Sequence, residues 1–259
     1  MSLALKLALS PLLVAQALHT RASVPRLPEA AGAREGVVGR GARSLRLLIA
    51  GDSSAAGVGV TQQERALSGQ LVPLIAARCD AQVHWALWAR TGLTTAQTFE
   101  LLRDAALLQA DLAVVVTGVN DVVDQVPSSH AVRARERIAN LLRNRGGAQH
   151  VVFCPLPPVH EFPSLPQPLR WMAGADARRH NRALREWVSL RHAAVGDVST
   201  PRLDEVHLSR DNMADDGFHP GEPVYRAVAH ALAAHIAEAV WPRLHLQAAA
   251  RRGPAHKTD

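Results

Sequence analysis

The chain has 259 residues, of which 47% are hydrophobic, and it carries a formal net charge of +6. A chain of this length and composition can bury the core of a single domain. The basic excess lies on the two ends, because residues 47–242 hold 18 Lys and Arg against 20 Asp and Glu. A nearly neutral body argues against a nucleic-acid-binding protein. The two cysteines, Cys79 and Cys154, are far apart in sequence and no metal or nucleotide fingerprint is present, so we predict buried thiols and no metal or cofactor.

The first 44 residues are predicted to form a leader and an irregular linker. Leu7–Ala15 is an apolar run after Lys6, and Ala15-Gln16-Ala17 fits the cleavage site of a signal peptide. The alternative is a retained amphipathic helix that lies on the domain or on a membrane. Two features count against a signal peptide: the charged region before the apolar run is thin, and Pro11 interrupts the run. The run is also too short to span a bilayer. We favour retention, and hence a cytoplasmic or membrane-peripheral protein over an exported one. The basic end Arg251–Asp259 is expected to be a solvated tail, and the alternative is a weak attraction of the two basic ends to an anionic membrane surface. Arg21–Arg43, rich in Pro, Gly and Arg, is expected to lack regular structure.

Alternating strand and helix patterns predict an α/β domain over residues 45–242, followed by a disordered basic tail over residues 243–259. Nearly continuous apolar runs are typical of parallel strands that are covered on both faces, and the alternation indicates a doubly wound sheet of about five strands. The predicted strands are Leu45–Ala50, Val83–Ala89, Leu112–Thr117, His150–Cys154 and Ala193–Val198. Helices are predicted near Glu64–Arg78, Thr95–Leu108, Ala131–Arg145 and Trp171–Arg191, and from Gly221 onward. Ligands in such sheets bind outside the carboxyl ends of the strands.

A nucleophile, a base and an orienting acid occur in the chain order Ser, Asp, His. Ser53 follows the first predicted strand in Gly51-Asp52-Ser53, and the motif Asp216-Gly217-Phe218-His219-Pro220 precedes the last helix. A serine hydroxyl needs an imidazole to take its proton, and a carboxylate to fix the tautomer of that imidazole. We expect Asp52 to organise the turn under Ser53 rather than to take part in chemistry.

Two further residues at strand ends are candidate donors to an oxyanion. Asn120 lies in Gly118-Val119-Asn120-Asp121, and its side-chain amide can donate a hydrogen bond to a developing negative charge. Gly92 follows another predicted strand and offers a bare backbone N–H to the same charge.

Each of these motifs also has a structural interpretation. Gly-Asp-Ser is a common turn, Asp216 can cap a helix, and glycines after strands are usually turn residues. Four such motifs in order, each at a strand or helix boundary, favour the catalytic interpretation.

The blocks around Ser53, Gly92, Asn120 and His219 resemble those of the SGNH (GDSL-type) hydrolase superfamily, in the same order. The stretches GDSSAAGVGV (51–60), GVNDV (118–122), FPSLPQPLRWMAGADARRHN (162–181) and DGFHP (216–220) are similar to a bacterial esterase subgroup, although Ser54 stands where GDSL has Leu. The resemblance covers roughly residues 45–240. It implies a flavodoxin-like three-layer α/β/α fold and metal-free ester hydrolysis. Ser53 would then be the nucleophile, His219 the base and Asp216 its partner, with an oxyanion hole formed by the N–H groups of Ser53 and Gly92 and by Asn120.

The segment Pro155–Pro168 is a proline-rich loop at the expected catalytic edge. Proline fixes φ and removes a backbone donor, so we predict a stiff loop rather than a strand or helix. Its apolar members, above all Phe162, either line an acyl pocket or anchor the loop to the core.

The resemblance predicts a serine esterase that acts on small or lipid-like carboxylic esters. The alternatives are a carbohydrate O-acetyl esterase, which the same site would serve, and a non-catalytic binding module on the same fold. Aromatic residues make up only 4% of the chain, which gives no sign of a sugar-binding platform.

Overall fold

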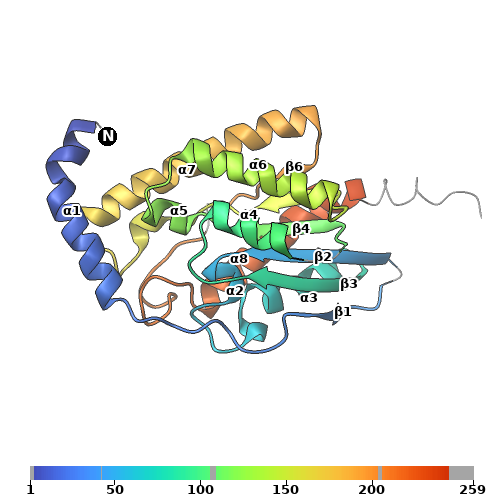
Figure 1. The fold of residues 1–259 in the computed structure, drawn as a ribbon. Helices are drawn as coiled ribbons and strands as arrows, with labels where there is room; N and C mark the ends of the chain where they lie inside the picture. Colours follow the sequence, from blue (N-terminus) through green and yellow to red (C-terminus); the bar gives the residue numbers. More distant parts are fainter. Residues whose placement is uncertain (1–2, 42, 106–108, 204–205, 245–259) are drawn as a thin grey trace, which may run out of the picture.

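Six strands form a single sheet in the order β1-β3-β2-β4-β5-β6 (Figure 1). The computed structural model describes residues 3–41, 43–105, 109–203 and 206–244. The strands are β1 (Glu35–Val38), β2 (Arg43–Gly51), β3 (Ala81–Ala89), β4 (Leu112–Val116), β5 (His150–Phe153) and β6 (Val198–Ser199). β2 to β6 run parallel, and β1 alone is antiparallel. Numbered along the chain, the five parallel strands have the order 2-1-3-4-5, which is the flavodoxin-like order.

Helices cover both faces of the sheet, so the fold has the expected three layers (Figure 1). The α-helices are α1 (Leu3–Ser23), α2 (Ser53–Ala56), α3 (Leu67–Arg78), α4 (Thr95–Asp104), α5 (Val119–Val123), α6 (Ser128–Asn144), α7 (Leu169–Ala194) and α8 (Glu222–His235). Short turns of other helix types are η1 (Gln63–Arg65), η2 (Val159–Glu161) and η3 (Ile236–Val240), the last of which continues α8. α3 and α8 pack on one face of the sheet, and α4, α6 and α7 pack on the other.

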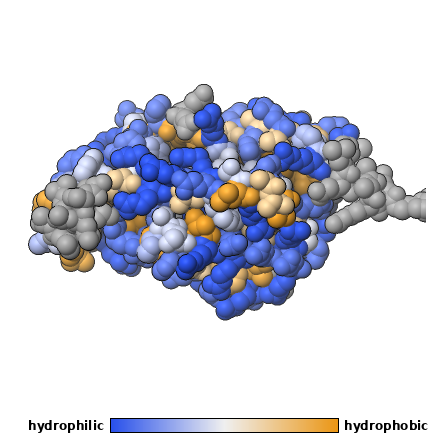
Figure 2. Space-filling model, turned by 90° about the horizontal axis from the view of Figure 1, so that it is seen from above, coloured by the Kyte–Doolittle hydropathy of each residue, from blue (hydrophilic) through white to orange (hydrophobic). Residues whose placement is uncertain are grey.

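The two cores are set by the alternation of side chains along β2. Leu47 and Ile49 point into the core beneath α3 and α8, whereas Leu48 and Ala50 point into the core beneath α4, α6 and α7. Because successive side chains of a strand face opposite sides, a strand covered on both faces is apolar throughout. The face that carries α7, seen from above, is mostly hydrophilic, with hydrophobic residues in small groups (Figure 2).

Two predictions about regular structure were wrong. Glu35–Val38 is a strand although the linker was expected to have none, because its backbone pairs with β3 at the edge of the sheet, which a short sequence with little apolar character does not reveal. Ala193–Val198 is not a strand: α7 extends to Ala194, and β6 has only two residues. Alanine is a strong helix former, and the helix ends only before Gly196, whose φ is +73°.

The leader forms α1, which lies against the N-terminal end of α7. Gln16 donates to the carbonyl of Gln167 at 2.7 Å and accepts from the backbone N–H of Leu169 at 3.2 Å. α1 thus packs on the domain, and retention of the leader stays a prediction. The division of the chain at residues 44 and 242 also stays a prediction, and residues 245–259 of the expected tail lie outside the described residues.

Candidate active site

Ser53 lies at the point where the strand order of the sheet reverses. Ser53 follows β2. In the sheet, β2 has β3 on one side and β4, which precedes Asn120, on the other. Such a switch point opens a crevice at the carboxyl ends of the strands. A side chain at Gly51 would collide with the carbonyl oxygen of Val116, so glycine permits the close approach of β2 and β4 directly before Ser53.

The carboxylate of Asp52 organises the turn that presents Ser53, as expected. It caps the single-turn helix α2 by accepting from the backbone N–H of Ser54 at 3.0 Å. Burial raises the pKa of Asp52 to about 7, although the hydrogen bond from Ser54 acts in the opposite direction and lowers it. Ser53 is the first residue of α2, and its Oγ faces His219.

The structure brings Ser53, His219 and Asp216 into one hydrogen-bonded chain. His219 Nε2 lies 3.1 Å from Ser53 Oγ, and His219 Nδ1 lies 2.6 Å from Asp216 Oδ2. A carboxylate accepts and cannot donate, so Nδ1 carries the proton and Nε2 of the neutral ring is left to accept from Ser53. The arrangement can therefore remove the hydroxyl proton of Ser53.

Asp216 is buried but stays ionised. Its burial favours the neutral acid, but hydrogen bonds from the side chain and backbone of His219 and from the backbone of Phe218 outweigh this and hold the pKa of Asp216 below its usual value. A buried carboxylate that keeps its charge can stabilise an imidazolium beside it.

Asn120, in the first turn of α5, contacts the loop that carries Gly92. Asn120 Nδ2 donates to the carbonyl of Leu93 at 3.0 Å, which uses one of its two N–H bonds. Gly92 has a φ of +85°, a conformation that side chains disfavour, and an added Cβ would meet nothing within 4 Å. The backbone strain, rather than crowding, is therefore what favours glycine at this position.

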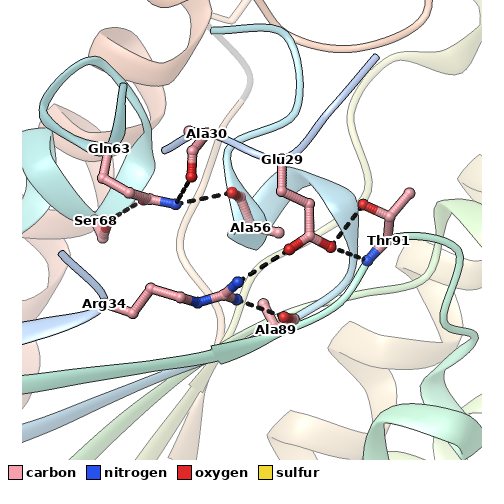
Figure 3. Close-up of polar contacts among 8 residues, drawn as sticks. All are labelled: Glu29, Ala30, Arg34, Ala56, Gln63, Ser68, Ala89 and Thr91. Carbon is pink, nitrogen blue, oxygen red and sulfur yellow. Dashed lines mark hydrogen bonds and ion pairs between the residues drawn. The ribbon is translucent and has the colours of Figure 1, made fainter. Parts of the chain in front are cut away.

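Glu29 is a residue of this region that sequence reasoning missed. Its carboxylate accepts from the backbone N–H and the hydroxyl of Thr91 at 2.7 and 2.9 Å, directly before Gly92 (Figure 3). Its other oxygen pairs with Arg34 at 3.0 Å. Glu29 lies in the proline-rich linker, where no periodic pattern marks it.

Gln63 is a second missed residue, and it ties the linker to the helix of Ser53. Its side-chain amide donates to the carbonyls of Ala56 and Ala30 at 2.9 and 3.2 Å, and its oxygen accepts from Ser68 at 2.8 Å (Figure 3). α2 is thus held at both ends, by Asp52 and by Gln63.

A small cavity of about 30 Å³ opens beside Ser53 and His219. Phe162 lines it and packs edge-on against Phe218, with ring centroids 5.1 Å apart. Phe162 is only 2% exposed, so it both lines the cavity and anchors the proline-rich loop. The rest of the lining is largely apolar: Val119, Pro157, Leu208, Met213, Phe218, Pro220 and Val224, with Ser54.

A larger cavity of about 600 Å³ lies beyond Pro157, after the ends of β5 and β6. It contains none of the proposed catalytic residues, and two other apolar members of the loop, Leu156 and Val159, face it. The loop itself includes the short turn η2. Among the described residues, no group of three or more His, Cys, Asp or Glu could hold a metal ion. Cys79 and Cys154 are both buried, as predicted.

The sequence from residue 49 to residue 227 matches a known family. The chain belongs to the GDSL-like lipase/acylhydrolase family. This confirms the resemblance to the SGNH superfamily and makes the chain a carboxylic ester hydrolase. The GDSL-like esterase Rv1075c of Mycobacterium tuberculosis is 26% identical over 95% of this chain and 80% of its own length.

Solved structures of other esterases share the fold of this GDSL-family chain. The lipase Lip_vut3 from a goat rumen metagenome has a TM-score of 0.61 at 20% identity, over 73% of this chain and 96% of its own. A family 3 carbohydrate esterase from Clostridium thermocellum has a TM-score of 0.60 at 15% identity, over 80% of this chain and 100% of its own. At these identities the likeness concerns the fold.

Proposed function

We propose that this hydrolase cleaves carboxylic esters through a covalent acyl-enzyme, with Ser53 as the nucleophile, His219 as the general base and Asp216 as the residue that orients the base. The observation that supports it most is the hydrogen-bonded chain from Ser53 Oγ through the ring of His219 to Asp216. A non-catalytic module has no need to keep this alignment at a strand switch point.

In the proposed reaction, Ser53 Oγ attacks the acyl carbon while its proton passes to Nε2 of His219. The negative charge then grows on the carbonyl oxygen, where the N–H groups of Ser53 and Gly92 and the free N–H of Asn120 donate to it. Collapse breaks the bond to the alcohol oxygen, which takes the proton from His219. Water, deprotonated by the same ring, then hydrolyses the acyl-enzyme and regenerates Ser53.

The proposed acyl group is short. A cavity of about 30 Å³ has room for only a few heavy atoms, and its walls are mainly apolar. This size also favours acetyl groups on carbohydrates as a second candidate substrate class. An acetyl-xylooligosaccharide esterase from a Geobacillus species shares the fold, with a TM-score of 0.56 at 15% identity over 79% of this chain and 97% of its own.

Labelling and turnover of two serine variants test the proposed function. Ser53→Ala should lose the activity on nitrophenyl acetate by several powers of ten and should no longer react with a fluorophosphonate, because the hydroxyl is the reacting group. Ser129→Ala, at an exposed serine of α6, should keep both. Activity above a few per cent in Ser53→Ala would contradict the proposal. Rates from acetate to palmitate, beside acetate release from acetylated xylan, separate the two substrate classes.

We further propose that α1 attaches the enzyme weakly to an anionic membrane surface. Leu12, Val14 and Leu18 expose 47%, 57% and 64% of their surface, and no acidic residue precedes Glu29 in the sequence. Exposed apolar side chains beside basic ones are the combination that binds a lipid interface. In the part of the chain that the structure describes, no helix is long and apolar enough to cross a membrane.

Cosedimentation of the full chain with vesicles tests this attachment. Binding should increase with the content of anionic lipid and should fall at least tenfold in Leu12→Glu/Leu18→Glu. Leu190→Glu changes an apolar residue on α7 that is even more exposed, at 75%, and should leave binding unchanged. Equal binding of all three proteins would exclude α1 as the contact.

A further inference from the structure

The loop that carries Gly92 is held at two threonines, one on each side of the glycine. Thr91 and Thr95 each give both their backbone N–H and their hydroxyl to a single carboxylate. The two carboxylates come from distant parts of the chain, Glu29 in the linker and Asp121 at the start of α5. At both ends of the loop, therefore, one threonine donates twice to one carboxylate, to a single oxygen of Glu29 and to both oxygens of Asp121.

At the first end, Glu29 fixes the backbone directly before Gly92. The two hydrogen bonds from Thr91 to Glu29 Oε1 are 2.7 and 2.9 Å long (Figure 3). The burial of Glu29 opposes its charge, but these bonds and Arg34 outweigh it and hold the pKa of Glu29 below its usual value. Glu29 therefore acts as an ionised acceptor at neutral pH.

At the second end, Asp121 fixes the backbone three residues after Gly92. Asp121 Oδ1 accepts from the N–H of Thr95 at 3.0 Å, and Oδ2 accepts from the hydroxyl of Thr95. Thr95 and Asp121 are both almost fully buried, at 0% and 1% exposure. The residue before Asp121 is Asn120, whose amide donates to Leu93 inside the same loop.

Each carboxylate has an arginine close to it. Arg34 pairs with Glu29 at 3.0 Å. Arg135 is 1% exposed on α6, donates to the carbonyl of Thr117 at 3.2 Å and is attracted by the charge of Asp121. Because opposite charges attract, Arg34 and Arg135 each help to hold the neighbouring carboxylate in place.

We propose that Glu29 and Asp121 are positioning residues that together fix the oxyanion donors Gly92 and Asn120. Neither residue touches the substrate. Each holds a threonine of the loop, and through it sets where the N–H of Gly92 and the amide of Asn120 point. Because a donor displaced by about 1 Å loses much of its effect on a transition state, a loop fixed at both ends keeps the donors in register. This inference rests on the proposed function of the same site.

Alanine and amide variants of the two carboxylates test this role. Glu29→Ala and Asp121→Ala should each lower kcat for nitrophenyl acetate about 10- to 100-fold, with KM changed less than about threefold, since the donors act mainly on the transition state. Glu29→Gln keeps an acceptor for the N–H of Thr91 and should retain at least about a third of kcat. The matched controls Glu35→Ala and Asp124→Ala remove exposed carboxylates on neighbouring elements and should leave both constants unchanged.

A double-mutant cycle separates positioning from a general structural effect. If Asp121 acts through the oxyanion donors, Asp121→Ala should lower kcat at least about threefold less in an Asn120→Ala background than in the wild type, where the substitution displaces both Asn120 and Gly92. An equal loss of kcat in both backgrounds, or an effect of Asp121→Ala that raises KM instead of lowering kcat, would overturn the proposal. If Asp121→Ala fails to fold, Asp121→Asn, which keeps the shape, takes its place in the cycle.

Amide hydrogen exchange gives a readout that needs no turnover. The N–H of Thr91 should exchange at least about tenfold faster in Glu29→Ala, and the N–H of Thr95 in Asp121→Ala, while amides of β4 should not change. Unchanged exchange would overturn the positioning role even in an active enzyme. Conversely, faster exchange in a chain that hydrolyses no ester would support the positioning role and count against the proposed function alone.

Discussion

Asp216 and His219 are joined twice, once through their side chains and once through the backbone. Asp216 Oδ2 lies 2.6 Å from His219 Nδ1, and Asp216 Oδ1 accepts from the backbone N–H of His219 at 2.9 Å. The three-residue spacing thus closes a loop in which one carboxylate fixes both the position and the tautomer of the ring. The proposed base and its partner therefore come from one short motif.

Replacement of Asp216 should be less damaging than replacement of the other two residues. Ser53→Ala and His219→Ala should each lower kcat by about a millionfold, and Asp216→Ala by about ten-thousandfold, because Asp216 orients and supports the base without reacting. Single-turnover rates with nitrophenyl acetate measure this. Asp215→Ala, at the exposed neighbouring carboxylate, should be unaffected. A loss in Asp216→Ala of less than tenfold would show that another group orients the ring.

Asn120→Ala should lower kcat about 100- to 1000-fold with little change in KM, the usual loss for one oxyanion donor. The reason is that its free N–H would meet a charge that develops only in the transition state. Steady-state kinetics with nitrophenyl acetate separate the two constants. A large rise in KM with kcat intact would instead assign Asn120 to substrate binding.

The parts of the site that sequence predicts are those built from local motifs. Ser53 and Asn120 lie in short helices directly after strands, and His219 lies in a turn before α8. Each of these boundaries has its own residue types, so the chemistry and the local structure point to the same positions. Glu29 has no such signal, because its partner Thr91 is 62 residues away and the contact exists only once the linker crosses the sheet edge. β1 escaped prediction for the same reason, since its backbone pairing with β3 stabilises it rather than any apolar pattern.

Widening the small cavity should change the acyl preference. Phe162→Leu removes part of the cavity wall, and we expect the ratio of hexanoate to acetate hydrolysis to rise about tenfold, because the fit of a methylene in a pocket is worth about 1–3 kcal/mol. Phe153→Leu is the matched control, since Phe153 is as deeply buried but packs against Trp187 in the core beneath α4, α6 and α7. Both variants should lose some stability, and only Phe162→Leu should change the ratio. If both keep the wild-type ratio, Phe162 only anchors the loop.

A buried histidine outside the proposed active site should make the fold less stable in mild acid. His150 Nε2 lies 2.8 Å from Ser199 Oγ, which also lies 2.8 Å from His235 Nε2. Burial, together with the nearby His235, Arg243 and His192, lowers the pKa of His150 to about 4. An unfolded histidine has a pKa near 6.5, so between about pH 6.5 and pH 4 the unfolded state binds a proton that the folded state does not.

The free energy of unfolding should therefore fall as the pH is lowered through this window, by up to roughly 3 kcal/mol from His150, and this contribution should level off below about pH 4. Urea denaturation at a series of pH values from 7.5 to 4 measures the slope. His150→Gln removes the titrating group but keeps a polar side chain beside Ser199. The slope of its unfolding free energy against pH should therefore be smaller, by up to the amount that the uptake of one proton on unfolding contributes. His130→Gln, at an exposed histidine, should keep the wild-type slope. If His150→Gln also keeps it, another group causes the acid sensitivity, with His235, whose pKa burial also lowers, as the next residue to replace.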